Sequence, residues 1–325
     1  MESDRYDDLD RQLVHSLQID GRAPFSAIAA VLEVSDKTVA RRYARLRSRG
    51  AVRVAGTTDP HALGEVVWFL RVRCAPDASV AVAEALARRS DTSWISLTSG
   101  GTEVVCIVQA DSEQQSEALL LHRLPRTPRV EGITAHCVLH HFFGGPASLI
   151  TKHGPLSGDQ IARLQPPPAR HRPGGVHLDA DDQRLLAVLA ADGRAGYEDL
   201  AAATGWSPST VRRRMAELRE CGALYFDVEY DWPIFGLLVR SLLWLSVAPA
   251  HLEATGRELA GHPEVAFVAA TTGPSNLCAS LISADRHALY AYLTTRIAGL
   301  PGITQVETAP VIRTLKRGVP RRHLP

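Results

Sequence analysis

An internal repeat is the feature that most constrains the fold of this chain. The tetrapeptide DGRA at 20–23 recurs at 192–195, which is a shift of 172 residues. The same shift holds without a gap between 10–52 and 182–224, where 19 of 43 positions are identical. Self-similarity at a fixed spacing indicates a duplicated folding unit. The 325 residues therefore have to be explained as two copies of one architecture.

Each copy is predicted to contain three helices. An apolar stripe at helical spacing marks the first helix. We expect Gly21 and Gly193 to end it, since glycine readily adopts the left-handed conformation of a helix cap. Short helices are predicted over 25–32 and 197–204, and a serine then opens a third helix in each copy. This order predicts a helix-turn-helix, which offers its last helix to the DNA major groove.

A second repeat follows each helical segment and predicts strands and helices in the order βαββαβ. The strands are expected at 66–72, 94–98, 104–108 and 133–142, and again at 237–247, 267–271, 277–283 and 303–315. The helices are expected near 80–89, 113–123, 252–260 and 286–298. This order is the ferredoxin-like pattern. The predicted fold class is α+β, with two helix-turn-helix domains each followed by a ferredoxin-like βαββαβ domain.

Five segments follow from these repeats. The first helix-turn-helix domain covers 1–58 and the first ferredoxin-like domain 59–145, and the corresponding second domains cover 178–230 and 231–325. Between the copies, 146–177 is rich in proline and glycine and is expected to be a semi-rigid linker with a short helix at 158–164. Because open sheet faces and edges are normally covered, we expect the two ferredoxin-like domains to pair within one chain, sheet facing sheet.

Composition excludes several classes of protein. The chain has 36 Lys plus Arg and 35 Asp plus Glu, so it is not uniformly basic. Its longest apolar stretch, 235–250, is interrupted by Arg240 and is too short to span a bilayer, and the acidic amino terminus lacks a signal-peptide core. A cytoplasmic location with no membrane partner is therefore expected. The five cysteines form no C-x-x-C pair, so neither a disulfide framework nor a thiolate zinc site is indicated.

The histidine-rich run His136, Cys137, His140 and His141 is a candidate metal or haem site. Two of its histidines share one face of a strand, but the third and fourth ligands expected for zinc are missing. Aligning Gly132 with Gly302 puts apolar residues or proline at the histidine positions in the other copy, which favours ordinary sheet packing. We therefore assign no metal and no cofactor. The common hydrolase motifs are missing as well, so no catalytic residue is assigned.

A basic run on the third helix is the strongest candidate site. Seven Lys and Arg face one acid between Ser35 and Arg53, an excess of six, whereas 207–225 has an excess of two. A solvated helix face is the simpler interpretation, but the preceding turn favours double-stranded DNA as the partner. The predicted contacts are Ser35, Lys37, Thr38, Arg41, Arg42 and Arg45 in the first copy and Ser207, Ser209, Thr210, Arg212, Arg213 and Arg214 in the second. We expect the first copy to contribute more to binding.

Together these motifs resemble the Lrp/AsnC transcriptional regulators. The resemblance rests on D-x-x-L-L-x-x-L, D-G-R, S-x-x-T-V-x-x-R-x-x-x-L and a closing glycine before strands, and it covers nearly all of both halves. The chain looks like a tandem member of that family. The resemblance implies a sequence-specific regulator, not an enzyme, that forms homo-oligomers and responds to a small-molecule effector, with an amino acid or related metabolite as a candidate.

The resemblance also implies where the effector binds, in the loops after the second strand of each ferredoxin-like domain. The residues implied are Thr98, Gly100, Gly101, Thr102, Thr271, Gly273, Ser275 and Asn276. The family's G-x-x-D pattern is replaced in both loops, by GGTE and GPSN. Two other functions remain open. Siroheme decarboxylases look like the same two-domain family and use its scaffold for tetrapyrrole chemistry, and a partner-binding protein would have helix-turn-helix units that no longer contact DNA.

Overall fold

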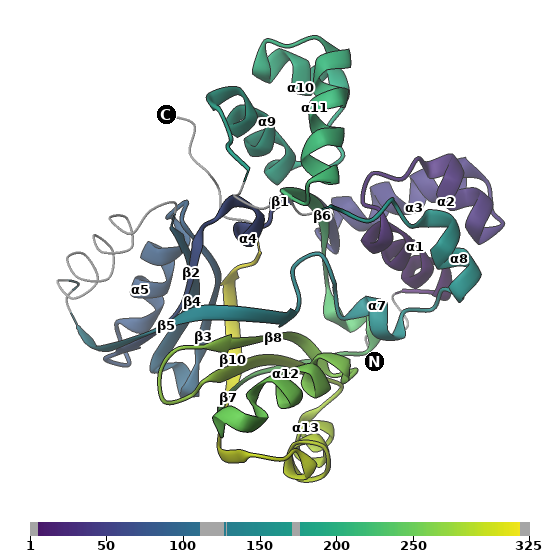
Figure 1. Cartoon of the computed structure of the whole chain (residues 1–325). Coiled ribbons are helices and arrows are strands. Elements are labelled where there is room, and N and C mark those ends of the chain that lie inside the picture. Colours follow the sequence, from purple (N-terminus) through teal and green to yellow (C-terminus); the bar gives the residue numbers. More distant parts are fainter. Residues whose placement is uncertain (1–5, 111–126, 128, 171–175, 319–325) are drawn as a thin grey trace. The chain divides into compact units, whose positions relative to one another are not determined.

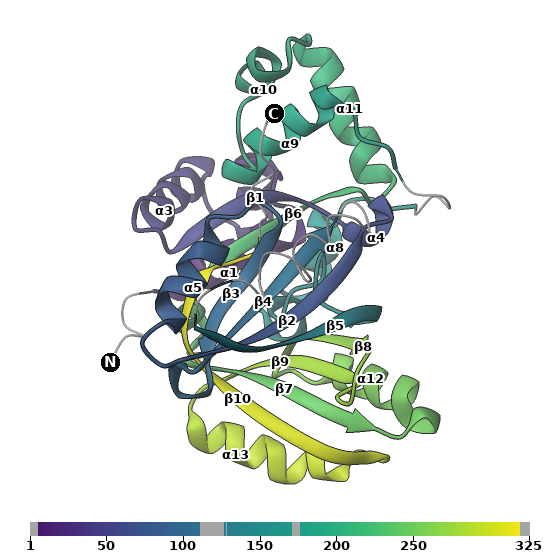
Figure 2. The same cartoon turned by 90° about the vertical axis from the view of Figure 1, so that its left-hand side faces the viewer.

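Two structural units are present in this computed structural model, which describes residues 6–110, 127, 129–170 and 176–318. The helical unit comprises residues up to 64 and 150–236, and the barrel unit comprises 65–149 with 237–320. Both are drawn in Figure 1 and, from the side, in Figure 2. The helix expected near 113–123 lies outside the described residues.

The helical unit contains two copies of three helices and a strand. The first copy has α1 (Asp8–Ile19), α2 (Phe25–Leu32), α3 (Asp36–Ser48) and β1 (Val52–Thr58). The second has α9 (Ala180–Ala191), α10 (Tyr197–Thr204), α11 (Pro208–Glu220) and β6 (Leu224–Tyr230). Both third helices begin as predicted, because Ser35 and Ser207 accept a hydrogen bond from the backbone N–H three residues later. Asp7 and Asp179 cap the first helices in the same way.

The two copies share one core and one small sheet. Strand β1 pairs antiparallel with β6, with Val52 opposite Tyr230 and Thr58 opposite Leu224. Leu13, Leu17, Leu185 and Leu189 are buried in the same apolar cluster. The sequence pattern did not predict this pairing, because each strand is short and its partner lies in the other copy.

The expected role of Gly21 and Gly193 is wrong. Each first helix ends at an aspartate with extended backbone, Asp20 or Asp192, and neither glycine adopts a positive φ. A Cβ at Gly21 would lie 2.7 Å from the Phe226 Cβ atom. A Cβ at Gly193 would lie 2.9 Å from the Val54 Cγ1 atom. These glycines are therefore needed for close approach between the two copies and not for a left-handed cap.

The segment between the copies contains two short helices, α7 (Ile150–His153) and α8 (Gly158–Leu164). Helix α8 has the bounds expected from the sequence and begins with a capping box at Ser157. It lies against the first copy, because Gln160 and Arg163 donate side-chain hydrogen bonds to the carbonyl oxygens of Val31 and Ala30.

The barrel unit contains the two ferredoxin-like modules. The first has β2 (Val66–Cys74), α5 (Ser79–Ala87), β3 (Thr92–Thr98), β4 (Glu103–Ala110) and β5 (Val130–Phe143). The second has β7 (Val239–Val247), α12 (Leu252–Gly261), β8 (Val265–Thr271), β9 (Leu277–Ser283), α13 (Arg286–Thr295) and β10 (Ile303–Lys316). The strands form one closed barrel in the order β10-β3-β4-β2-β5-β8-β9-β7.

The predicted pairing of the two modules within one chain is confirmed. The long strands β5 and β10 each pair first inside their own module and then with a strand of the other, β5 with β8 and β10 with β3. Phe69 of the first module and Leu242, Trp244 and Cys278 of the second share an apolar cluster. Closure of the barrel removes the open edges that the isolated modules would expose.

The alignment used for the histidine-rich run is off by three residues. Cys137 lies opposite Trp68 on β2, and Pro310 lies opposite Ser241 on β7. Because β2 and β7 are equivalent strands, Cys137 corresponds to Pro310, and His136 therefore corresponds to Ala309. His136 is buried and its Nδ1 atom lies 2.8 Å from the Thr272 carbonyl oxygen. The two glycines are not equivalent, because Gly132 pairs with Arg73 on β2, whereas the equivalent residue of β7, Ser246, pairs with Gln305.

One difference between the copies yields a stability prediction. Helix α2 ends at Glu33, which has a left-handed φ of 57°, and α10 ends at the equivalent Gly205, with φ 76°. Left-handed backbone costs a non-glycine residue about 1 kcal/mol. Glu33→Gly should therefore raise the free energy of unfolding by about 1 kcal/mol, and Gly205→Ala should lower it by a similar amount. Urea unfolding measures both, and a destabilised Glu33→Gly protein would contradict the argument.

Candidate DNA-binding helices and effector pocket

The predicted DNA contacts of the first copy divide into two groups. Lys37 and Arg41 are exposed on α3, and no hydrogen bond or ion pair involves their side chains within the described residues. Near the start of the helix, Ser35 and Thr38 bond to each other through their hydroxyl groups, 2.9 Å apart. The exposed start of α3 therefore presents two free cations and two hydroxyl groups, which suits contacts to phosphates and base edges.

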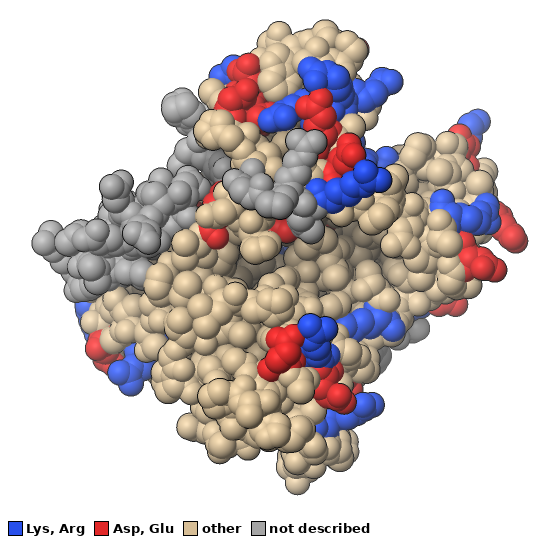
Figure 3. Space-filling view, in the orientation of Figure 1, with Lys and Arg blue, Asp and Glu red and all other residues tan. Residues whose placement is uncertain are grey.

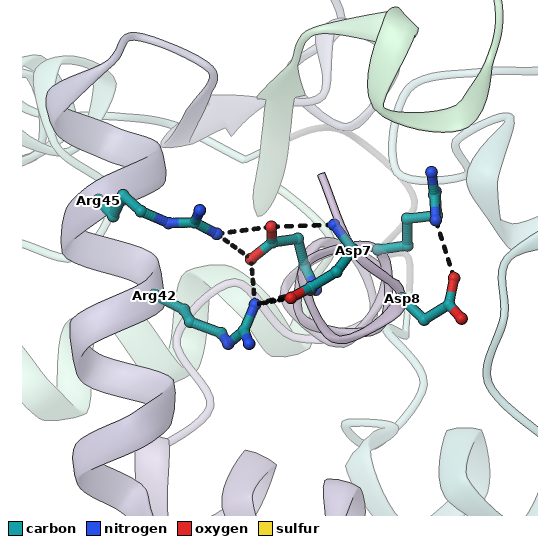
Figure 4. A network of polar contacts seen from close by, with 6 residues as sticks. Asp7, Asp8, Arg42 and Arg45 are labelled. Atoms are coloured by element: carbon teal, nitrogen blue, oxygen red, sulfur yellow. Dashed lines mark hydrogen bonds and ion pairs between the residues drawn. The ribbon is translucent and has the colours of Figure 1, made fainter. Parts of the chain in front are cut away.

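Arg42 and Arg45 instead hold α3 against α1, as Figure 4 shows. The Arg42 Nη1 atom lies 2.6 Å from Asp7 Oδ1 and 3.0 Å from Asp10 Oδ1, and the Arg45 Nη2 atom lies 2.6 Å from Asp10 Oδ2. The side chain of Asp10 is only 1% exposed, so both arginines neutralise a buried carboxylate. These two predicted DNA contacts are thus already engaged inside the helical unit.

The pKa values follow from this geometry. Partial burial raises the pKa of Asp7, but its hydrogen bonds with Arg42 and the Asp10 backbone outweigh this and leave the pKa below its usual value. The hydrogen bond from Arg42 to Asp7 raises the pKa of that guanidinium despite its desolvation. Each ionised group therefore stabilises the other.

In the second copy, each of the three predicted arginines of α11 has a partner. Arg214 binds buried Asp182 through Nε and Nη2, at 2.8 and 2.6 Å. Arg213 lies 2.6 Å from Glu217, one turn later on the same helix. Arg212 stacks on the Tyr197 ring at 4.8 Å. Figure 3 shows basic and acidic side chains interleaved over this copy.

A pocket of about 460 Å³ opens in the barrel unit beside the first glycine loop. The strands β2, β4, β5 and β10 and the loop after β3 all contribute to it. Its lining is polar and consists of Arg71, Arg73, Ser99, Thr102, Glu103, Thr134 and Glu307. A volume of this size is typical of small-molecule sites.

Arg71 joins the two modules at the pocket wall. Its Nε atom lies 2.8 Å from Glu103 Oε1, and its Nη1 atom lies 2.9 Å from Glu307 Oε2. Desolvation lowers the pKa of Arg71, but the hydrogen bonds to Glu307 and Glu103 outweigh it and leave the pKa raised. The guanidinium also stacks on the Trp244 ring at 4.8 Å. Arg71 is therefore a permanently charged, fully engaged part of the wall.

The residues predicted to bind an effector are only partly gathered in this pocket. Thr102 lines it, whereas Thr98 is buried and donates to Glu103, and Gly100 and Gly101 form the turn beside it. In the second copy, Thr271 donates to the Ser275 carbonyl oxygen and Asn276 bonds to the backbone of Val247. Gly273 lies against His136.

Six of the seven lining residues were not predicted from the sequence, namely Arg71, Arg73, Ser99, Glu103, Thr134 and Glu307. The first two left a signal, because charged residues alternate with apolar ones along β2, and that pattern places both on one face of an otherwise apolar strand. Among the described residues, no cluster of three or more His, Cys, Asp or Glu is arranged to hold a metal ion. Within the same residues, no helix is long and apolar enough to cross a membrane.

Comparison with known protein families gives matches in three regions. Residues 7–47 and 178–219 both match the AsnC-type helix-turn-helix domain. Residues 241–320 match the Lrp/AsnC ligand binding domain. The two helix-turn-helix matches coincide with α1–α3 and α9–α11 of the helical unit.

Curated relatives are named as transcriptional regulators. The HTH-type transcriptional regulator FL11 of Pyrococcus horikoshii is 27% identical over 142 residues, covering 43% of this chain and 93% of that protein. An uncharacterized HTH-type transcriptional regulator of Pyrococcus furiosus is 31% identical over 129 residues, covering 39% of this chain and 85% of that protein. Each relative thus corresponds to about one half of the tandem chain.

A solved structure matches both halves at once. The siroheme decarboxylase NirDL is 14% identical to this chain, with a TM-score of 0.63, and the match covers 96% of this chain and 94% of that one. At this identity the likeness shows a shared fold. Residues of this one chain match two AsnC-type helix-turn-helix domains and an Lrp/AsnC ligand binding domain, and a regulator that is 31% identical is covered over 85% of its own length. These matches show that the chain is a tandem member of the Lrp/AsnC family.

Proposed function

We propose that the protein is a sequence-specific transcriptional regulator that binds double-stranded DNA and responds to a small-molecule effector held between its ferredoxin-like modules. The observation that carries the proposal is the exposed start of α3, where Lys37 and Arg41 have no partner among the described residues. Free cations on the third helix of a helix-turn-helix are placed to neutralise phosphates and to read guanine edges.

The first copy is proposed to contribute more of the affinity. Arg41 is free within the described part of the chain, whereas the equivalent Arg213 is bound to Glu217. An arginine that must leave a carboxylate partner to contact DNA contributes less to the free energy of binding, and the carboxylate also repels phosphate. The two copies therefore offer unlike surfaces, which favours an operator that is not a perfect palindrome.

Arg41→Ala should weaken DNA binding more than Arg213→Ala, the matched substitution in the second copy. For Arg41→Ala we expect the slope of log affinity against log salt to become shallower by about one. Gel shifts on the protein's own upstream region at several salt concentrations measure both variants. Equal losses, or a greater loss for Arg213→Ala, would refute the asymmetry, and no binding by the unaltered protein would refute the DNA-binding function.

An enzymatic function is the alternative, because the NirDL likeness extends over nearly the whole chain. We propose that this protein does not share that activity, since the curated relatives are named as regulators. Absorbance of the purified protein separates the two functions. A Soret band together with turnover of a tetrapyrrole would favour the enzyme, and operator binding without either would favour the regulator.

A further inference from the structure

Helices α7 and α8 pack on the first helix-turn-helix copy, as Figure 1 shows. Helix α7 lies against α1, and α8 lies against both α1 and α2. Together with the residues between them they form the segment 150–164, which we call the strap. Three of its side chains are buried in the core of the helical unit, those of Ile150, Leu156 and Leu164. The strap is therefore folded onto this unit along its whole length.

Two side chains of the strap bind carbonyl groups at the end of α2. The last four carbonyl groups of a helix have no donor inside the helix itself. The Gln160 Nε2 atom donates to the Val31 carbonyl oxygen at 3.1 Å. The Arg163 Nη2 atom donates to the Ala30 carbonyl oxygen at 3.0 Å. The strap thus holds the end of α2 that leads into the turn before α3.

A third hydrogen bond fixes the strap to α1. The Leu156 N–H donates to the His15 Nδ1 atom at 3.3 Å. Burial lowers the pKa of His15 to about 4, so the ring is neutral at pH 7 and this nitrogen can accept the bond. Gly154 lies so close to the same ring that a Cβ atom there would overlap it. The strap therefore fits closely against α1 as well as against the end of α2.

The end of α2 is a strained position that needs such support. Glu33 follows the helix with a φ of 57°. A left-handed backbone is costly for a residue that has a side chain. Residues in such a conformation persist where the surrounding structure holds them in place. The hydrogen bonds of Gln160 and Arg163 to the last turn of α2 supply this support directly before Glu33.

Within the described residues, the second copy has no equivalent of these two hydrogen bonds. A shift of 172 residues relates the carbonyl groups that the strap binds on α2 to those of Ala202 and Ala203 on α10. No side chain in the described part of the chain donates to either of them. Helix α10 instead ends at Gly205, with φ 76°, a conformation that glycine adopts readily. The two copies therefore hold the turn before the third helix in different ways.

We propose that the strap positions the DNA-binding helix of the first copy. By holding the end of α2, it keeps the turn at 33–35 and the exposed start of α3, with Lys37 and Arg41, in one arrangement before DNA is bound. A protein that binds DNA in only one of its arrangements loses affinity in proportion to its population of the others. The inference rests on the proposed DNA-binding function, and it makes Gln160 and Arg163 positioning residues that act through α2.

The test breaks both hydrogen bonds in the full chain, with Gln160→Glu and Arg163→Ala together. Glutamate can still accept from the Ser157 N–H, as the Gln160 Oε1 atom does in the capping box, but it has no hydrogen to donate to Val31. Gel shifts on the upstream region should show binding about fivefold weaker, the ratio that corresponds to one lost hydrogen bond. The slope of log affinity against log salt should stay the same, because the free cations of α3 still neutralise the same phosphates.

The control is Ala162→Glu together with Arg170→Ala. Like the strap variant, it adds one negative charge and removes one positive charge. Ala162 is exposed on α8, and the Arg170 side chain is exposed without a partner among the described residues. We therefore expect its DNA affinity to stay within about twofold of that of the unaltered protein. If circular dichroism shows that the strap variant is unfolded, Gln160→Glu alone and Ala162→Glu alone give the same comparison.

Equal affinities of the strap variant and the control would overturn the proposal, and so would a shallower salt slope for the strap variant, because the loss would then follow charge and not position. If the unaltered protein binds its upstream DNA and the strap variant binds equally well, the DNA-binding function stands and only the role of the strap is rejected. If the unaltered protein does not bind, the proposed function fails and this inference fails with it.

Discussion

Replacing Arg42 and Arg45 together with alanine is expected to lower the free energy of unfolding by about 3–5 kcal/mol. Both guanidinium groups bind Asp10, whose side chain is 1% exposed. The double variant leaves a buried carboxylate with neither of its cations, and the protein must then protonate it, admit water or separate α3 from α1. Urea unfolding at neutral pH measures the loss.

The matched control is Arg41→Ala, on the same helix. The Arg41 side chain is exposed and has no partner among the described residues, so we expect its stability to change by no more than about 0.5 kcal/mol. DNA affinity should respond in the opposite order, with a large loss for a folded Arg41→Ala protein. A double variant at Arg42 and Arg45 that is as stable as Arg41→Ala would show that Asp10 is not held by these arginines.

Local patterns were sufficient to predict the helices of both copies. The bounds of α2 and α10 agree with the sequence expectation, because small-residue pairs, a turn and an N-cap serine all specify the same elements. In the second module the βαββαβ order was predictable for the same reason, as were the described elements of the first, with strand bounds shifted by a few residues. Whether a segment forms a helix or a strand depends mainly on residues that are close in the sequence, so a single segment is enough to predict it.

The candidate sites were less predictable, because a count of charges does not tell which side chains face the solvent and which face the protein. Arg42, Arg45 and Arg214 were counted toward the DNA surface, yet all three bind a buried aspartate of the first helix. A signal was present in the repeat itself, since Asp10 and Asp182 occupy equivalent positions and each carries a partner arginine 32 residues later. The pocket was hidden for a different reason, because β10 brings Glu307 to it from the second module.

The repeated DGR motif makes contacts between the two copies that the sequence alone did not predict. Arg22 donates to the carbonyl oxygens of Gly193 and Ala195, at 2.7 and 3.1 Å. In the same way, Arg194 donates to the carbonyl oxygens of Gly21 and Ala23 in the first copy, at 2.7 and 3.0 Å. The aspartates of the same motifs pair across the copies as well, Asp20 with Arg219 and Asp192 with Arg47. The motif therefore joins the two helix-turn-helix modules to each other.

Arg22→Ala combined with Arg194→Ala should accordingly uncouple the modules and lower the free energy of unfolding by about 2–4 kcal/mol. Each substitution leaves backbone carbonyl groups without a hydrogen-bond donor. The substitution of Arg194 also removes its stacking on Phe25, at 4.4 Å. The control is Arg184→Ala, because that arginine pairs with Asp181 on its own helix and contributes little to stability.

DNA binding gives a second measure of the coupling between the modules. Modules held at a fixed spacing bind two half-sites with less loss of entropy, so the double variant should lose affinity for the upstream region although α3 and α11 keep their exposed surfaces. An unfolding midpoint equal to that of Arg184→Ala, with unchanged DNA affinity, would show that β1, β6 and their core couple the modules without the DGR motif.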